Sequence, residues 1–353
     1  MDKKRALIAM SGGVDSSVAA YLSVNSDLDC IGVTMKLYDN ETEGEKTCCS
    51  VDDINDARNV CNRLDIPYYV FNFKDDFKNK VIDKFICAYE CGMTPNPCID
   101  CNRYLKFDRL LKRAKETDCD YVVTGHYAII EEKDGRYFLK KAADETKDQS
   151  YVLYSLTQQQ LKHTLFPLGK MEKSEVRKIA EENGFVNANK RDSQDICFVP
   201  DGDYASVIEK YTGNTYPEGN FVTKDGKILG RHKGIIRYTI GQRKGLGLAL
   251  PEPMYVFEKK LKENEVVLCK NSELFSSELI AGDFNWIMFD TPPESVRIKA
   301  KIRYNQKEQA ATAYPLSDGR VKIVFDEPQR AIAKGQAVVL YDGDYVAGGG
   351  TIL

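Results

Sequence analysis

A glycine-rich turn between an apolar run and a helical pattern is the feature that most constrains this chain. Residues 6–10 are apolar, residues 11–17 read SGGVDSS, and residues 14–22 place apolar side chains along one helical face. Glycine lets the backbone come close to an anion, while a helix start offers unpaired N–H groups and the positive end of the helix dipole. The pattern predicts a phosphate-binding loop that follows the first strand of a sheet.

The first two hundred residues continue this alternation of strand and helix. Further strands are expected at residues 30–37, 68–73 and 121–124, and a helix between the last two ends before Gly92. Strands separated by helices of this length favour an α/β fold with a doubly wound parallel sheet of the Rossmann-like kind. Ligands of such folds bind at the carboxyl ends of the strands.

Beyond residue 200 the pattern changes to β-branched stretches punctuated by glycine turns. A chain of 353 residues also exceeds what one hydrophobic core normally serves. We therefore expect three domains: residues 1–200 for nucleotide binding, residues 201–276 as a small central domain, and residues 277–353 as a C-terminal β-barrel.

The composition favours a cytoplasmic protein. There is no apolar run of about 18 residues, and the charged N-terminal residues do not resemble a signal peptide. The 11 cysteines are an odd number, so in a reducing compartment they are better interpreted as thiols, ligands or catalysts than as disulfides. Five of them lie in periodic apolar stretches and are interpreted as packing residues: Cys30, Cys61, Cys87, Cys119 and Cys269.

The net charge of −3 hides two basic stretches without any acidic residue, at 226–251 and 295–307. In the second, strict alternation predicts a strand with four basic residues on one face: Arg297, Lys299, Lys301 and Arg303. Either stretch alone is compatible with a solvated surface. Two of them in one acidic chain favour a polyanion-binding face.

Two cysteines lie in distinctive segments. The proline-stiffened sequence TPNPCIDC, at residues 94–101, leads into a helix that we expect to begin near Cys101. A cysteine at a helix start, with Arg103 and Lys106 close by, holds its thiolate well. The other is Cys197, within SQDICF at residues 193–198.

The SGGVDSS loop lacks the lysine of a Walker A sequence and resembles the PP-loop of ATP pyrophosphatases, which cleave between the α and β phosphates. Together with the two cysteine segments, Gly125-His126, residues 147–149, residues 241–246 and Arg303-Tyr304, it makes the chain similar to the tRNA-specific 2-thiouridylases over essentially its whole length.

This resemblance implies ATP-dependent 2-thiolation of uridine at the tRNA wobble position, with AMP and pyrophosphate released. Cys101 would be the nucleophile and Cys197 the persulfide carrier. ATP, with Mg²⁺, would contact Ala9, Met10, Ser11, Gly12, Gly13, Val14, Asp15, Ser16, Met35 and Gly125. The tRNA would contact Asn96, Pro97, Cys98, His126, Lys147, Asp148, Gln149, Arg303, Tyr304 and Gln336. The resemblance also implies a sulfur donor, such as a cysteine desulfurase or a persulfide relay protein. We expect no membrane association, and a monomer.

One position departs from the commoner family pattern, because Cys98 stands where many members carry Asp. Cys98, Cys101 and Cys197 then offer three thiolates, a set that suits a [4Fe–4S] cluster with one iron open for sulfide. The same set would suit zinc, or Cys98 would be an auxiliary thiol or a redox partner of Cys101. The sequence leaves these alternatives open.

Two other functions share part of the pattern. PP-loop enzymes that make GMP, NAD or argininosuccinate have the same loop but do not need Cys101, Cys197 or a basic β domain. A non-catalytic RNA-binding protein could keep the nucleotide fold for stability alone, although an intact loop and paired cysteines argue against it.

Overall fold

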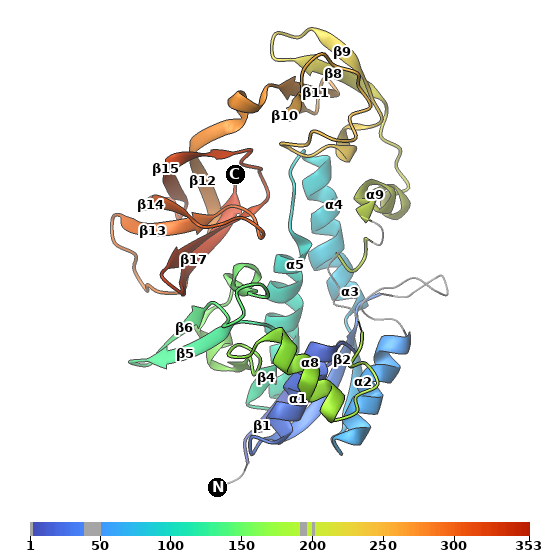
Figure 1. Cartoon of the computed structure of the whole chain (residues 1–353), viewed down its shortest axis with the longest axis vertical. Helices are drawn as coiled ribbons and strands as arrows, with labels where there is room; N and C mark the ends of the chain where they lie inside the picture. Colours follow the sequence, from blue (N-terminus) through green and yellow to red (C-terminus); the bar gives the residue numbers. More distant parts are fainter. Residues whose placement is uncertain (1–2, 39–50, 191–195, 200–201) are drawn as a thin grey trace. The chain divides into compact units, whose positions relative to one another are not determined.

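The computed structural model describes residues 3–38, 51–190, 196–199 and 202–353 (Figure 1). Part of the SQDICF segment, residues 193–195, lies outside the described residues. Backbone contacts divide the chain into two compact units. Unit 1 contains Met1–Ile82, Pro97–Pro200 and Gly343–Ala347, and unit 2 contains Asp83–Asn96, Asp201–Asp342 and Gly348–Leu353.

Unit 1 is built on the parallel sheet that the sequence predicts. Its strand order is β3-β2-β1-β4-β7, from Tyr68–Asn72, Asp29–Lys36, Arg5–Ala9, Tyr121–Val123 and Thr164–Leu165. Side chains of β1 share one core with helices α1 (Val14–Val24), α2 (Val51–Arg63) and α8 (Lys173–Glu182). The unit also contains the hairpin β5 (Ile129–Lys133) and β6 (Arg136–Lys140), the 3-10 helix η3 (Ser150–Leu153) and α7 (Gln158–Lys162).

Two long helices each contain a π-helical turn. One runs through α3 (Lys74–Phe77), η1 (Lys78–Ile82) and α4 (Asp83–Glu90), and ends as predicted before Gly92, whose φ is +75°. The other runs through α5 (Pro97–Asp100), η2 (Cys101–Arg109) and α6 (Leu110–Glu116). It begins at Pro97 and not near Cys101, because proline is favoured at the first position of a helix. Cys98, rather than Cys101, therefore lies in its first turn.

Unit 2 contains the β-rich elements expected after residue 200. Helix α9 (Tyr204–Thr212) precedes a sheet with the order β10-β11-β8-β9, from Tyr255–Lys260, Glu265–Cys269, Gly219–Thr223 and Ile228–His232. Six strands then form a closed barrel in the order β12-β15-β14-β13-β16-β17. They are Phe275–Trp286, Val321–Arg330, Gln309–Pro315, Val296–Lys301, Ala337–Asp342 and Tyr345–Ile352. The pairing of β12 with β17 closes it, which confirms the predicted C-terminal β-barrel.

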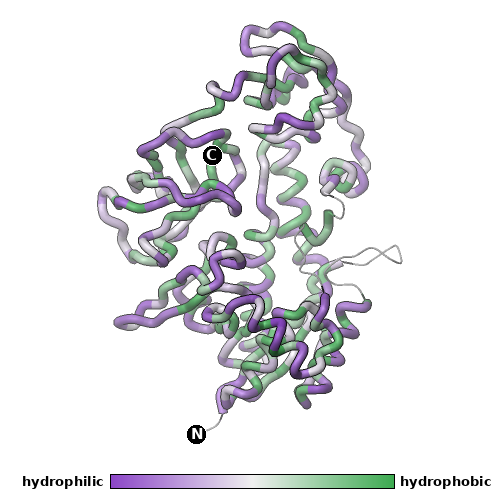
Figure 2. Tube along the Cα trace, viewed as in Figure 1, coloured by the Kyte–Doolittle hydropathy of each residue, from purple (hydrophilic) through white to green (hydrophobic). Residues whose placement is uncertain are grey.

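Hydrophobic and hydrophilic residues alternate in short stretches along both units (Figure 2). Within the described parts of the chain, no helix is both long and apolar enough to cross a membrane.

Four of the five cysteines interpreted as packing residues are buried, and burial raises the pKa of Cys61 to about 12 and that of Cys30 to about 11. The interpretation of Cys87 is wrong, because its side chain is exposed. The buried residues of α4 are Phe85, Ile86 and Tyr89, and Cys87 lies off that face of the helix.

Lys259 on β10 is an unusual buried cation in unit 2. Its Nζ is buried without a hydrogen-bond partner among the described residues, and it lies 5.8 Å from the ring centre of Tyr89. Tyr89 in turn stacks on Tyr204 at a centroid distance of 4.6 Å. Loss of hydration lowers the pKa of Lys259 from 10.5 to about 8.

We expect Lys259→Met to raise the free energy of unfolding at pH 7 by up to about 3 kcal/mol, because each pKa unit corresponds to about 1.4 kcal/mol. The folded state binds fewer protons than the unfolded chain between pH 8 and 10.5. The wild type should therefore gain stability as pH rises through this window, whereas Lys259→Met should not. Urea unfolding at several pH values, in the presence of a reductant, measures both.

The matched control is Lys260→Met, which removes a lysine from the same strand whose side chain is 39% exposed. A Lys259→Met variant with unchanged stability and the wild-type pH slope would show that burial of this amine has no energetic cost.

Candidate active site

The loop between β1 and α1 is shaped by close backbone packing. Gly12 has φ of +73°, and an added Cβ would lie only 2.3 Å from the carbonyl oxygen of Asp53 at the start of α2. Gly125, which follows β4, approaches the other side of the turn, and a Cβ there would lie 2.8 Å from the carbonyl carbon of Asp15. Both positions therefore require glycine.

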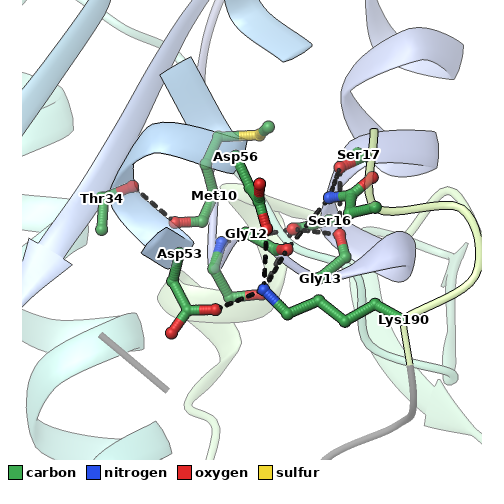
Figure 3. A network of polar contacts seen from close by, with 11 residues as sticks. Met10, Gly12, Gly13, Ser16, Ser17, Thr34, Asp53, Asp56 and Lys190 are labelled. Atoms are coloured by element: carbon green, nitrogen blue, oxygen red, sulfur yellow. Dashed lines mark hydrogen bonds and ion pairs between the residues drawn. The ribbon is translucent and has the colours of Figure 1, made fainter. Parts of the chain in front are cut away.

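Hydrogen bonds fix the remaining loop residues (Figure 3). The Ser16 hydroxyl donates to the Gly13 carbonyl at 3.0 Å and accepts from the Ser11 N–H at 3.2 Å. The Ser17 hydroxyl also donates to the Gly13 carbonyl, at 3.0 Å. Thr34 of β2 donates to the Met10 carbonyl at 2.8 Å. The loop is thus fixed by hydrogen bonds to its own residues and to β2.

The residues expected to contact ATP gather at one edge of the sheet. Residues 9–16 span the end of β1 and the start of α1, Met35 is near the end of β2, and Gly125 follows β4. Because β2, β1 and β4 are adjacent and parallel, these positions share the carboxyl edge, where a parallel sheet binds ligands.

Two lysines that sequence reasoning missed neutralise carboxylates around the loop. Lys173 of α8 donates to Asp15 Oδ1 at 2.6 Å, and Tyr127 donates to the same oxygen at 2.9 Å. Lys190 Nζ donates to Asp53 at 2.6 Å and to Asp56 at 2.8 Å (Figure 3). No local motif marks these lysines, because their partners lie more than 130 residues away in sequence.

This arrangement fits a magnesium–phosphate ligand. Three carboxylates facing two ammonium groups leave the surroundings of the loop negatively charged, which disfavours a bare polyphosphate. Within the described residues, Asp15 Oδ2 has no hydrogen-bond partner, and a carboxylate oxygen is a ligand that Mg²⁺ prefers.

The three candidate cysteines all belong to unit 1. Cys98 is exposed, whereas Cys101 and Cys197 are partly exposed. Cys98 and Cys101 are three residues apart in one helix, so they share a face. The Cys197 carbonyl accepts a hydrogen bond from Tyr38, which follows β2, at 3.2 Å. The segment that carries Cys197 is therefore anchored near the carboxyl end of β2.

No disulfide joins Cys101 to Cys197 in this structure. Among the described residues, no three cysteine, histidine or acidic side chains converge as a metal site, so Cys98, Cys101 and Cys197 do not form a ready ligand set. The arrangement does not fit a preformed iron–sulfur or zinc centre.

His126 is buried beside the helix that carries Cys101. Its Nδ1 lies 2.7 Å from the Thr124 hydroxyl, and its Nε2 lies 3.5 Å from Lys106 Nζ. Burial, and then the charge of Lys106, lower the pKa of His126 well below 6.5. A neutral imidazole that accepts at Nε2 from an ammonium carries its proton on Nδ1 and donates it to Thr124.

Several residues expected to contact tRNA have internal hydrogen bonds. Asp148 accepts from the N–H groups of Ala142 and Ser150, and Gln149 Oε1 accepts from the Tyr127 N–H at 2.9 Å. Lys147 is partly exposed in the same loop. These bonds order the loop of residues 142–150.

The remaining residues expected to contact tRNA divide between the units. Pro97 and Cys98 belong to unit 1, whereas Asn96, Arg303, Tyr304 and Gln336 belong to unit 2. Gln336 donates to the Thr94 carbonyl at 2.8 Å, and Arg303 donates to the Ala331 carbonyl. Tyr304 is 39% exposed.

The predicted basic strand is β13 (Val296–Lys301), with Ile298 and Ala300 buried as expected. It ends one residue before Ile302, which is also buried, so Arg303 lies beyond the strand and not on its basic face. Its charge is less uniform than the sequence indicates, because the two terminal nitrogens of the Arg297 guanidinium, Nη1 and Nη2, donate to Asp326 of β15. Lys299 is exposed, and Lys301 lies over the ring of Tyr341. The two lysines are therefore the better candidates for phosphate contacts.

Protein-family models cover nearly the whole chain: the tRNA methyl transferase HUP domain at residues 4–201, the tRNA methyl transferase PRC-barrel domain at 205–270 and the aminomethyltransferase beta-barrel domain at 276–352. A tRNA-specific 2-thiouridylase MnmA of Clostridium beijerinckii is 53% identical over 353 residues, which cover 99% of each chain. That of Clostridioides difficile is 55% identical, covering 99% of this chain and 98% of the relative. The chain belongs to the tRNA-specific 2-thiouridylase family.

Solved structures are similar to this chain at lower sequence identity than these relatives. A 4-thiouridine synthetase–RNA complex with bound ATP has a TM-score of 0.35 and 19% identity, covering 60% of this chain and 50% of the other. An NMN synthetase from Francisella tularensis has a TM-score of 0.34 and 16% identity, covering 61% of this chain and 79% of the other.

We expect His126 to remain neutral across the range from about pH 5 to 8 in which histidines ordinarily titrate, because burial disfavours its charged form. Lys106→Met should raise the pKa of His126 only part of the way back toward 6.5, since burial is the larger cause of its lowering. The chain has three histidines, so NMR titration of the imidazole signals is tractable.

Lys112→Met, an exposed lysine on the same continuous helix, is the control and should leave the His126 titration unchanged. A wild-type His126 that titrates near 6.5 would contradict the buried, neutral imidazole.

Proposed function

We propose that the chain is an ATP-dependent tRNA uridine 2-sulfurtransferase. It adenylates the 2-carbonyl of uridine at the tRNA wobble position and replaces that oxygen with sulfur, releasing AMP and pyrophosphate. The observation that carries the proposal is the preformed glycine turn at the sheet edge, where Gly12 and Gly125 leave no room for side chains, in a chain that also contains Cys101 and Cys197.

The loop residues would bind the triphosphate through N–H groups at the start of α1 and through the exposed Ser11 hydroxyl, while Ser16 holds the loop through its bond to the Gly13 carbonyl. Asp15 would hold Mg²⁺, which when bound offsets the negative charge of the phosphates. Adenylation is needed because a carbonyl oxygen is a poor leaving group, whereas AMP leaves readily.

The sulfur would arrive as a persulfide on Cys197. In one route, the terminal sulfur of the persulfide attacks the adenylated carbon directly and AMP leaves. In the other route, Cys101 first releases that sulfur as hydrogen sulfide, which then attacks the carbon and displaces AMP. In both routes the Cys101 thiolate attacks the inner sulfur of Cys197, the bond between the two persulfide sulfurs breaks, and a Cys101–Cys197 disulfide forms. The transferred sulfur is thereby reduced while two thiols are oxidised. A dithiol reductant restores them before the next cycle.

Cys101 and Cys197 must approach each other for this step, with Cα atoms about 4.4–6.8 Å apart. Cys98 would be an auxiliary thiol beside the target base, together with Asn96 and Pro97. Its place in the first helical turn favours a thiolate.

Lys299 and Lys301 would provide contacts to phosphates of the RNA. His126 and residues 147–149 would position the loop of residues 142–150 in unit 1. A cysteine desulfurase or a persulfide relay protein would supply the sulfur. We place this monomeric enzyme in the cytoplasm, where its tRNA substrate is found.

We expect Cys101→Ser and Cys197→Ser to abolish thiolation and to leave ATP binding intact, because neither cysteine belongs to the phosphate loop. Mass spectrometry of tRNA detects 2-thiouridine, and chromatography identifies the nucleotide product. Cys87→Ser, a change at an exposed cysteine outside the site, is the control and should retain full activity. Formation of ADP in place of AMP would contradict the assignment, as would thiolation by either serine variant.

The sulfur source is tested by strictly anaerobic purification followed by iron and sulfide analysis. Full single-turnover thiolation by iron-free, persulfide-loaded protein supports the persulfide route, and Cys98→Asp should then keep substantial activity. Dependence on reconstituted iron and sulfide would replace this route with one in which Cys98, Cys101 and Cys197 hold a cluster.

We expect the double variant Lys299→Ser/Lys301→Ser to weaken tRNA binding. The salt dependence of binding should fall by roughly one unit of slope for each phosphate that the strand no longer neutralises. Arg297→Ser is the matched control on the same strand and should have a smaller effect, because Asp326 already neutralises Arg297. Fluorescence anisotropy at several salt concentrations measures both. An unchanged slope in the double variant would identify the strand as a solvated face only.

A further inference from the structure

Residues 187–190 join the phosphate loop to the chain that carries Cys197. Asn187 Nδ2 donates to the Gly12 carbonyl at 3.0 Å and to the Ser17 hydroxyl at 2.9 Å. Lys190 Nζ lies 3.3 Å from the same Gly12 carbonyl. Two side chains from one short segment thus donate to one carbonyl of the loop.

Holding this carbonyl fixes the direction of the next N–H group. The C=O of Gly12 and the N–H of Gly13 belong to one planar trans peptide, in which they point to opposite sides. With the Gly12 oxygen held by Asn187 and Lys190, the Gly13 N–H points away from these two side chains. Without these two donors, glycine at both positions would let the peptide flip.

The same ammonium balances two acids beside the loop. Burial lowers the pKa of Lys190, but hydrogen bonds and charge from Asp53 and Asp56 outweigh this effect and raise it above 10.5. Lys190 therefore stays charged at neutral pH. A change that removes the ammonium would leave both carboxylates uncompensated close to an incoming triphosphate.

The backbone of this segment is itself anchored. Arg177 of α8 donates to the carbonyls of Ala188 and Lys190, at 3.3 Å and 3.2 Å. Lys190 precedes Cys197 by seven residues, and the Cys197 carbonyl accepts from Tyr38 at the sheet edge. Lys190 and Cys197 are therefore both tied to the carboxyl edge of the sheet, Lys190 through the Gly12 carbonyl and Cys197 through Tyr38.

We propose that Lys190, with Asn187, is a positioning residue that sets the Gly12–Gly13 peptide for ATP and couples nucleotide binding to the reactivity of Cys197. This inference rests on the proposed ATP site. A merely structural lysine would affect stability alone, whereas a positioning lysine also changes ATP affinity and the response of Cys197 to ATP.

The experiment compares Lys190→Met with Lys190→Arg and with Lys178→Met, an exposed lysine of α8 paired with Glu182. Calorimetry measures ATP affinity. Mass spectrometry follows the alkylation rate of Cys197 with and without saturating ATP and Mg²⁺, with Cys87 as an internal reference. Neither measurement requires tRNA or a sulfur donor, so failure of the proposed thiolation chemistry would not be mistaken for failure of this inference.

We expect ATP to change the alkylation rate of Cys197 several-fold in the wild type and in Lys178→Met. Lys190→Met should bind ATP about tenfold more weakly, the loss expected for one charged hydrogen-bonding group. At saturating ATP its Cys197 should no longer respond, while Lys190→Arg should restore most of both effects.

Unchanged ATP affinity in Lys190→Met would overturn the positioning role. The coupling would be overturned if ATP left the alkylation rate of Cys197 unchanged in the wild type. It would also be overturned if ATP changed this rate equally in the wild type and in Lys190→Met. If Lys190→Met does not fold, Asn187→Ser provides the second test. This variant has a shorter side chain in place of the other donor to the Gly12 carbonyl, so it should also weaken ATP binding. Unchanged ATP affinity in Asn187→Ser would likewise overturn the proposal.

Discussion

The close approach of backbone to backbone at Gly12 and Gly125 is the constraint on which the rest of the site depends. A methyl group at either position would meet main-chain atoms of Asp53 or Asp15 at less than 3 Å. Only without these side chains can the turn after β1, the end of β4 and the start of α2 meet at one edge of the sheet.

The acidic side chains around this junction are each paired with a lysine. Asp15 is paired with Lys173, while Asp53 and Asp56 share Lys190. Lys173 and Asp53 are buried, whereas their partners Asp15 and Lys190 are partly exposed, as is Asp56, so one member of each pair remains near water and ions. The fold thereby keeps acidic groups beside an anion site, an arrangement compatible with a nucleotide that arrives together with a divalent cation.

The sequence predicted the four strands β1 to β4 well, because each is an apolar run between helical patterns, and it predicted the barrel from its glycine turns. It missed the hairpin of β5 and β6 and the two-residue strand β7, which lack such a pattern. It misplaced the start of the helix before Cys101, since the prolines at residues 95 and 97 indicated a loop although Pro97 is the first helical residue. It also failed at Cys87, where an apolar neighbourhood masked an exposed helical face.

Contacts between residues far apart in the sequence could not be predicted from local sequence patterns. The pairing of Lys190 with Asp53 spans 137 residues, and that of Arg297 with Asp326 joins two strands of the barrel. The internal hydrogen bonds of Asp148 and Gln149 likewise depend on where the loop folds. A motif could mark these residues as characteristic of the family, but not whether each one faces a ligand or supports its neighbours.

The contrast between buried and accessible thiols has a consequence for how an enzyme handles reactive sulfur. A persulfide exchanges with any thiolate that it can reach, so each additional cysteine is a competing acceptor that can divert sulfur from the substrate. Cys30, Cys61, Cys119 and Cys269 are buried, and their raised pKa values keep them protonated. Exposed Cys91 also has a raised pKa, through partial burial and its contact with Cys87. With the proposed persulfide chemistry, the fold thereby limits misdirected sulfur exchange at five of the nine described cysteines.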